Sequence, residues 1–466
     1  MRKVYLFLMV FISVGCWSQN KQILYNFTAV PQSLMTNPGA DVSYKFYFGV
    51  PLLSGISVNA GTTSFSAYDL FADNGVDFNT KLRDVVYNSS RNDKVAINEQ
   101  IELFSGGFKL GDWMENKGYI SFGMYQEFDF MMFMPKDIAL LALDGNRGYL
   151  GKSFNLGDLS LRAEMLSVLH VGFHKNVTDR LVLGGRAKLY SSSFNATSTK
   201  NSGYIYTIPA QNTVYEQVIY SDLQLNTSGI SEYIAEDYEG DAAGDIRKKA
   251  LFGADLGLGF DLGLTYYPKK NIQFTASILD VGFVKHSKDV ETFTYKGYYK
   301  YEGINPSFNS TNSPNDVYQE FKEAIPRDTI YSAYKTWRPI KFNSSYQYSF
   351  NDSRGGVDCS CTVSESEYKN AVGGQLFVMT TPRAPMMALT GYYRRNLLDK
   401  LQMKATYTVD SYSYKNIGLG LSSTLGKFNV YLMADNLLEY RDLAKVNSLS
   451  FQFGFNFIFK DSDSPY

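Results

Sequence analysis

The chain has 466 residues and a formal net charge of −1, so it lacks the basic surface that nucleic-acid binding requires. Tyrosine (36) and phenylalanine (33) are abundant, whereas tryptophan (3) and cysteine (3) are scarce. The mean hydropathy of −0.22 resembles that of a soluble protein, but it does not exclude a membrane β-barrel, which faces lipid with only every second residue.

Residues 1–18 are predicted to form a cleaved secretory signal peptide. Two basic residues precede an apolar run from Val4 to Val14, which is too short to anchor the chain in a bilayer. Small residues at −3 and −1 predict cleavage after Ser18. The alternative is a lipoprotein signal with acylated Cys16, although Ser13 stands where such signals usually carry leucine.

Beyond the signal peptide, no segment reaches the roughly 18 apolar residues of a membrane-spanning helix. An exported chain of this kind enters a membrane only as a closed barrel, because lipid leaves no other way to satisfy the backbone. We expect residues 19–42 to lie in the periplasm or the lumen, residues 43–459 to form the barrel, and residues 460–466 to form a tail.

Alternation of apolar and polar residues with period two predicts the strands. In the last strand, leucine and five phenylalanines from Leu449 to Phe459 alternate with serine, glutamine, glycine and asparagine. Successive side chains of a strand point to opposite faces, so one face suits lipid and the other a polar lumen. The pattern recurs, for example in 120–130, 255–266, 272–278, 401–410 and 416–422.

Short links alternate with long ones, as in bacterial outer-membrane barrels with short periplasmic turns and long outer loops. The fold class is therefore all-β, an antiparallel up-and-down transmembrane barrel of about 14 strands with a short plug-like N-terminal segment. The expected strands are 43–63, 99–111, 117–131, 156–175, 180–197, 250–267, 271–284, 338–350, 369–380, 386–395, 399–410, 414–424, 427–437 and 447–459. Segments 203–227 and 291–303 are assigned to hairpins rising from outer loops.

Charged residues of both signs fall on the polar faces of the predicted strands. We expect them to face the lumen, where they would pair with one another and hold a plug; the alternative is general lining of the lumen. These lumen-facing candidates are Arg186, Lys188, Asp255, Asp261, Lys404 and Asp435.

The sequence predicts no enzyme, cofactor or metal site. His170 and His174 share one face of a strand, but the sequence shows no third ligand beside them, so lumen lining is the simpler interpretation. No nucleophile motif of the Gly-x-Ser-x-Gly type occurs.

Cys359 and Cys361 are the only cysteines left after cleavage, in a link assigned to the periplasm. An even number of cysteines in an exported chain favours a disulfide. Unpaired or intermolecular thiols, or a metal or redox site, remain alternatives.

Asn37-Pro38-Gly39, directly before the first strand, resembles the N-terminal region of FadL-like barrels and of the PorV-like and PorP/SprF-like barrels of the Bacteroidota. This resemblance implies a plug or hatch at these three residues. Residues 48–57, 68–73 and 447–459 resemble a flavobacterial family of outer-membrane proteins of unknown function. The resemblance implies a fold and a place in the cell outer membrane, but no activity.

The alternating Phe455, Phe457 and Phe459 resemble the β-signal by which the barrel-assembly machinery recognises its clients. The chain departs from that pattern because seven residues follow Phe459. The expected partners are this machinery during biogenesis, outer-membrane lipid and, in one interpretation, another outer-membrane protein.

Two functions follow from these features. The first is a passive channel for small hydrophobic compounds, as the FadL-like resemblance implies. The second is a non-catalytic accessory or scaffold subunit of a secretion or assembly complex, with the long links 198–250 and 285–337 as contact surfaces. A continuous apolar pocket beside residues 31–39 would favour the channel, and a lumen blocked by side chains would favour the accessory subunit.

Overall fold

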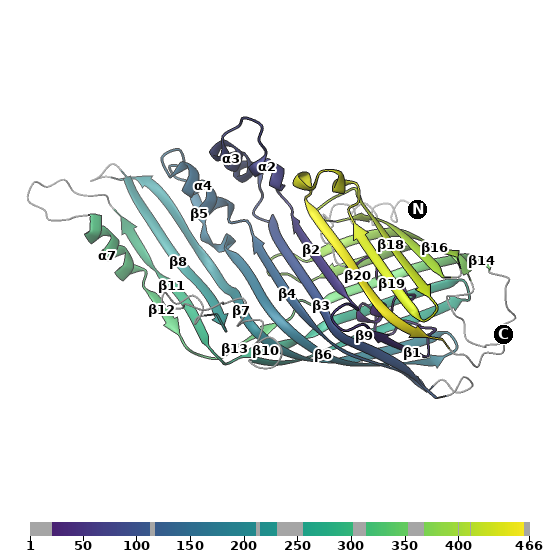
Figure 1. Cartoon of the computed structure of the whole chain (residues 1–466). Helices are drawn as coiled ribbons and strands as arrows, with labels where there is room; N and C mark the ends of the chain where they lie inside the picture. The colour runs from purple at the N-terminus through teal and green to yellow at the C-terminus, as the bar shows by residue number, and fades with distance from the viewer. Residues whose placement is uncertain are drawn as a thin grey trace, which may run out of the picture.

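The computed structural model describes residues 21–111, 117–210, 215–230, 255–301, 314–352, 368–398, 400–410 and 412–460. The predicted signal peptide, Cys16, Cys359, Cys361 and nearly all of the predicted tail lie outside these residues. The described chain forms one closed antiparallel barrel with long, strongly tilted strands (Figure 1).

Fourteen positions make up the barrel wall, and the predicted fold class is confirmed. The first position is shared by two short strands, which pair with the last strand on one side and with β3 on the other. In order around the wall, the strands are β1 (Phe46–Gly49) with β2 (Ile56–Thr62), β3 (Lys94–Leu110), β4 (Gly118–Phe133), β6 (Ser160–Thr178), β7 (Leu181–Pro209), β9 (Asp255–Lys269), β10 (Ile272–His286), β14 (Lys341–Asp352), β15 (Tyr368–Met379), β16 (Met386–Leu398), β17 (Leu401–Val409), β18 (Asn416–Leu425), β19 (Phe428–Asp435) and β20 (Ser448–Phe459).

The prediction of one continuous strand over 43–63 was wrong. The chain leaves the ladder between β1 and β2, with Leu52 in the left-handed region (φ 64°) and Ser54 fully buried. The hydroxyl of Tyr431 donates to the Ser54 carbonyl oxygen at 3.0 Å. Pro51 lies in this interruption and has no N–H to give to a ladder, which explains why regular pairing stops there.

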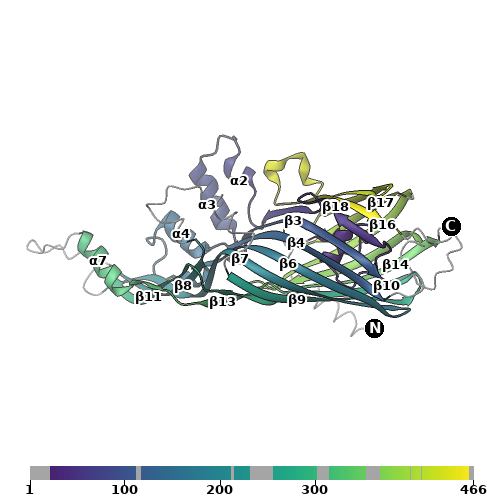
Figure 2. The same cartoon turned by 60° about the horizontal axis from the view of Figure 1, so that its bottom comes forward.

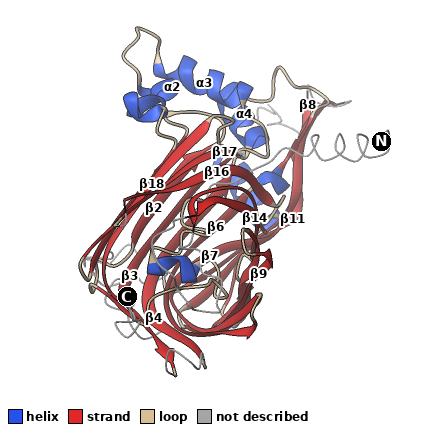
Figure 3. Ribbon diagram, turned by 90° about the vertical axis from the view of Figure 1, so that its right-hand side faces the viewer, coloured by secondary structure: helices blue, strands red, loops and turns tan. Residues whose placement is uncertain are grey.

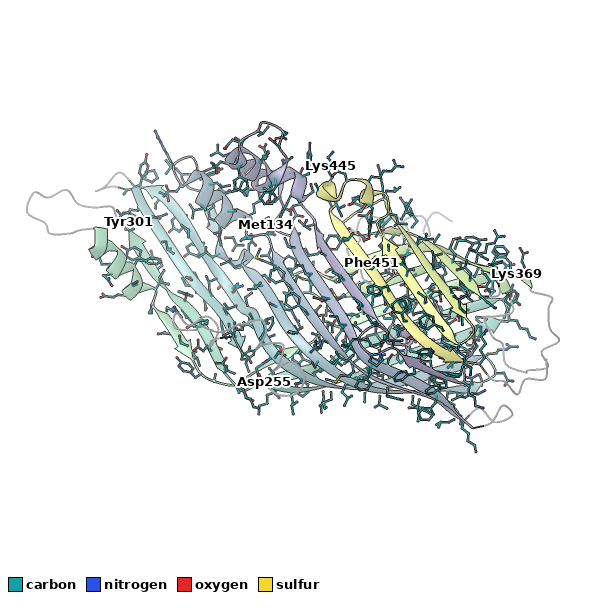
Figure 4. All side chains as sticks on the ribbon, viewed as in Figure 1. Met134, Asp255, Tyr301, Lys369, Lys445 and Phe451 are labelled. Carbon is teal, nitrogen blue, oxygen red and sulfur yellow. The ribbon has the colours of Figure 1, made fainter. Side chains whose placement is uncertain are left out.

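The two faces of the wall differ as the alternation predicts. On β9, Leu256, Leu258, Phe260 and Leu262 are 49–62% exposed, whereas Asp255 and Asp261 are buried. Side chains project from both faces of the strands throughout the wall (Figure 4). An apolar outer face around a polar interior is the arrangement that a hydrocarbon environment requires of a barrel.

An extension of the same sheet projects from one end of the barrel (Figure 1). It begins with the far part of β7 and continues through β8 (Tyr215–Ser228), β11 (Val290–Tyr301) and β12 (Arg327–Ile330), with β5 (Ser153–Asn155) on the other edge of β7. We call these strands the outer sheet. The described parts of the predicted hairpins at 203–227 and 291–303 belong to it.

Short helices gather at the same end, which we call the long-loop end (Figure 3). These are α2 (Ala67–Phe71), α3 (Phe78–Asn88), α4 (Lys136–Asp144) and α7 (Pro314–Ala324). Side chains cap the first two, since Ser66 and Asp69 form a capping box on α2 and Asp77 caps α3. Among the described residues, no helix has the length and apolar character needed to cross a membrane.

Candidate functional site: a plug seated in the barrel

Residues 21–44 precede the first strand and lie inside the barrel, where most of them are buried; we call them the plug. They form the dark purple loops that the wall encloses in Figure 2. A 3-10 helix, η1 (Pro31–Met35), begins at a proline, whose fixed φ suits a first helical turn. The plug then leads into β1 at the end of the short turns.

The Asn-Pro-Gly element of the plug lies directly against two glycines of the wall. Gly184 of β7 and Gly263 of β9 pair with each other in the ladder. A Cβ on Gly184 would overlap the Pro38 carbonyl, and a Cβ on Gly263 would overlap the Asn37 side chain. The wall therefore lacks side chains at the place where the plug backbone approaches it, and only glycine fits there.

Hydrogen bonds fix the same element to β9 and β10. The Thr265 hydroxyl donates to the Gly39 carbonyl at 2.8 Å, and the Ser277 hydroxyl donates to the Thr36 carbonyl at 2.7 Å. The Asn37 amide accepts from the Gly39 N–H at 2.9 Å, which shapes the turn itself. The plug backbone thus finds on the wall the partners that an irregular buried segment needs.

Two of the predicted lumen-facing cations, Arg186 and Lys188, share the carboxylate of Asp261, and Arg186 also holds the plug. Arg186 donates to the carbonyls of Leu34 at 3.0 Å and Met35 at 2.8 Å. Its Nε also donates to Asp261 at 2.7 Å, and Lys188 approaches the same carboxylate at 2.9 Å. All three charged side chains are at most 3% exposed, so these charge-assisted bonds form away from bulk water.

The ion pairs continue toward the long-loop end as one network. Lys188 pairs with Asp280 at 2.5 Å. Lys341 pairs with Asp280 at 3.0 Å and with Glu127 at 3.4 Å. Arg338 pairs with Glu127 at 2.8 Å and also bonds Glu164. Because positive and negative groups alternate, the network keeps many buried charges paired across several strands.

The opposite side of the plug is apolar. Phe27, fully buried, packs with Tyr431 and Met433 of β19 in a cluster that also contains Ile23, Leu24 and Val30. On this side Lys404 donates to the Tyr25 carbonyl, so its charge serves the plug backbone. The plug thus meets an apolar surface on one wall and a charged surface on the other.

The plug fills much of the lumen, since most of its residues are buried against the wall. A cavity of about 40 Å³ lies beside Met35 and Thr36, which is room for only a few water molecules. Lys21, Glu127 and Asp280 are among its polar lining residues. A lumen occupied by side chains was the feature expected of an accessory subunit. For the protein to act as a channel, the plug has to move.

The remaining predicted residues also lie on the inner side of the wall. Asp255 accepts from Ser228 at 2.6 Å and pairs with His286 at 3.3 Å, and Asp435 is 4% exposed. His170 and His174 are buried against the tyrosines of β4. Within the described chain, no group of three or more His, Cys, Asp or Glu is placed to hold a metal ion.

Some residues of the network were missed in the sequence. Glu127 and Asp129 lie on the polar face of the alternating segment 120–130, so the alternation could have identified them. Asp280 was hidden because it sits in a bulge of β10 with φ 62°, which breaks the alternation. Arg338 lies between β13 (Tyr334–Trp337) and β14, where no strand pattern gives its direction.

Phe455, Phe457 and Phe459 share one face of β20. Phe459 pairs with Phe46 of β1 where the first and last strands meet, with ring centroids 5.4 Å apart. The proposed recognition by the barrel-assembly machinery stays a prediction.

Several solved barrels are similar in fold. The toluene transporter TbuX of Ralstonia pickettii is 9% identical, with a TM-score of 0.42 over 96% of this chain and 100% of that one. A FadL homologue of Pseudomonas aeruginosa is 10% identical, with a TM-score of 0.42 over 94% and 95%. The toluene transporter TodX of P. putida is 9% identical, with a TM-score of 0.37 over 95% and 94%. At this distance their function does not transfer to this chain.

No curated protein matches the sequence. A family model described as a family of unknown function, DUF5723, matches residues 38–435, from Pro38 of the plug to the end of β19. The chain belongs to this family.

Proposed function

We propose that the protein is a passive channel of the outer membrane for small hydrophobic compounds, closed at rest by its N-terminal plug. The observation that carries the proposal is that apolar plug side chains occupy apolar patches of the inner wall. These patches would face the lumen once the plug shifts. The apolar outer face and the long loops at one end support placement in the outer membrane with those loops outside.

Three such patches support the proposal. Phe27 and its neighbours cover Tyr431 and Met433. Leu34 and Tyr44 cover a second patch on β1, β4 and β20, and Met35 covers a third between β4 and β10. The plug side chains stand where an apolar solute would gain the same burial, about 25 cal/mol per Å² of apolar surface.

The hydrogen bonds of the plug support a plug that can move. Several of them join a wall side chain to a backbone carbonyl of the plug, as for Arg186 with Met35, Ser277 with Thr36 and Thr265 with Gly39. Water can replace such partners, because the net value of one exchanged hydrogen bond is about 1 kcal/mol between neutral groups and about 1.5–3 kcal/mol when one group is charged.

The test is to pin the plug reversibly. Asn26 of the plug donates to Thr275 of β10 at 3.0 Å, so Asn26→Cys with Thr275→Cys offers a cross-link in a Cys359→Ser, Cys361→Ser background. We expect intact cells carrying the oxidised form to lose uptake of labelled toluene, and a reductant to restore it. The double serine variant alone is the control.

The channel proposal would be overturned by equal uptake in three kinds of cell: those with the cross-linked plug, those with the free plug and those that lack the protein. An uncharged sugar of similar size serves as the second solute, because an apolar pathway should leave its uptake near background.

A second candidate is the accessory or scaffold subunit. The plug inside the lumen and the outer sheet favour it, since exposed Tyr204 and Tyr298 on strands of this sheet offer aromatic contact area. Gentle detergent extraction of a tagged, natively expressed chain, followed by native mass spectrometry, tests this candidate. A stoichiometric complex with another outer-membrane protein would support the scaffold and demote the channel.

A further inference from the structure

Two lysines lie directly opposite each other at the upper edge of the apolar outer face. Lys285 of β10 pairs with Lys335 of β13 in the antiparallel ladder, and both are exposed. Their inward neighbours Val284, His286 and Thr336 are buried, which places both ammonium groups on the outside of the wall. Like charges directly opposite each other on neighbouring strands are destabilising unless an anion lies between them.

Neither lysine forms an ion pair with a carboxylate of the described residues. Lys335 instead lies 5.3 Å from the centre of the Phe283 ring. This contact with the aromatic ring stabilises the charge of Lys335 in part. The pair still carries two positive charges.

The apolar face ends immediately below the pair. Phe283 pairs with Trp337, their rings meet edge to face at 5.7 Å, and Trp337 is 68% exposed. Phe283 also pairs with Leu258 of β9, within the exposed apolar row of that strand. Tryptophan at such an edge is typical of the boundary between hydrocarbon and head groups.

The height of the apolar row agrees with this boundary. From Tyr266 at the short-turn end, β9 rises ten residues to Leu256, about 33 Å along a strand. A tilt of roughly 40° turns this length into a height of about 25 Å, which is the height of the apolar band of outer-membrane barrels. The lysine pair therefore stands at the level of the head groups.

We propose that Lys285 and Lys335 bind a phosphate of a phosphorylated lipid head group of the outer leaflet, with Trp337 and Phe283 against the upper part of its acyl chains. One phosphate between two ammonium groups removes their repulsion and forms charge-assisted bonds to both. The lipid is recognised by its phosphate, and its chains cover the apolar row that runs down β9 and β10. This inference rests on the proposed orientation in the outer membrane and is independent of channel activity.

The test titrates the purified full chain in detergent with lipid A that carries its phosphates and with the same lipid after phosphate removal. Native mass spectrometry counts the bound lipid. We expect wild type to prefer the phosphorylated lipid and Lys285→Gln with Lys335→Gln to lose roughly 10- to 30-fold in affinity for it. Lys285→Arg with Lys335→Arg should keep the preference.

Lys269→Gln with Lys270→Gln is the matched control, because it removes two exposed lysines at the short-turn end. Equal binding of both lipids by wild type, or equal losses in the two glutamine pairs, would overturn the inference.

A separate measurement checks orientation. In a Trp113→Phe variant whose signal peptide with Trp17 has been removed, Trp337 reports its depth through quenching by brominated lipids. Quenching near the head groups with no phosphate preference refutes this site alone, whereas no quenching refutes the membrane placement on which the proposed function also rests.

Discussion

The two halves of the inner wall hold the same plug through different kinds of interaction. The half formed by β4, β6, β7, β9, β10 and β14 is charged, and its network contains Glu127, Asp129, Glu164, Arg186, Lys188, Asp261, Asp280 and Lys341. The half formed by β15 to β20, which we call the neutral half, carries mainly hydroxyl and amide groups, with Lys404 and Asp435 among its few buried charges. The hydroxyl and amide groups include Gln375, Thr390, Thr408, Asn429 and Asn456. Bonds from charged groups dominate the contacts of the plug on the first side, whereas apolar packing dominates on the second, where Lys404 alone of the residues named above bonds the plug backbone.

The difference shows how a barrel can seat a segment without strand pairing. Long cations such as Arg186 reach backbone carbonyls from a distance and fix where the plug lies. The apolar cluster around Phe27 contributes burial, which depends less on direction. We therefore expect changes in the charged half to cost more stability than changes in the neutral half.

The largest effect is expected for Arg338→Met. This change leaves Glu127 and Glu164 buried without their shared cation and should lower the free energy of unfolding by roughly 3–5 kcal/mol. Urea unfolding of the barrel in lipid vesicles measures the loss. Adding Glu164→Gln should recover part of it, and a loss below about 1 kcal/mol would contradict the role of the network.

Arg186→Met should have the next largest effect, about 3 kcal/mol, because Lys188 still pairs with Asp261. Both plug carbonyls lose their donor, so Thr36→Cys placed in this background should react faster with a maleimide than Thr36→Cys alone. Unchanged labelling would show that the charged half does not hold the plug.

Gly184→Ala should displace the Asn-Pro-Gly element, because the new methyl group overlaps the Pro38 carbonyl. We expect a loss of roughly 1–3 kcal/mol from this overpacking. Gly374→Ala is the matched control, since nothing lies within 4 Å of a Cβ on that glycine of β15. The same unfolding assay compares the two, and equal stability would mean that the plug does not depend on the glycine seat.

The smallest effect is expected for Thr390→Val in the neutral half. Its hydroxyl shares a buried hydrogen bond of 2.8 Å with Thr408, and the loss should be about 1 kcal/mol. Adding Thr408→Val should cost little more, because no partner is then left unsatisfied. A loss as large as that of Arg338→Met would erase the distinction between the two halves.

Much of the site could be predicted along single strands. Arg186, Lys188 and Asp261 were assigned to the lumen from alternation alone, and all three side chains are buried in the structure. Alternation gives the face of a residue but not its partner, so the shared use of Asp261 and the bonds to Met35 were not visible. Asp280 and Arg338 escaped because a bulge and a strand break interrupt the period on which the inference depends.

The sequence by itself determined the fold class, the number of wall strands and the faces of most strand residues, because period-two alternation is a local property of extended backbone. Only the tertiary structure decided what fills the lumen. The contact of Pro38 with Gly184 and the ion pairs of Arg338 join residues 146 and up to 211 positions apart along the chain, and no local pattern carries such a distance. Closing the barrel brings these groups together, since the register of fourteen strands sets which side chains share one height in the lumen.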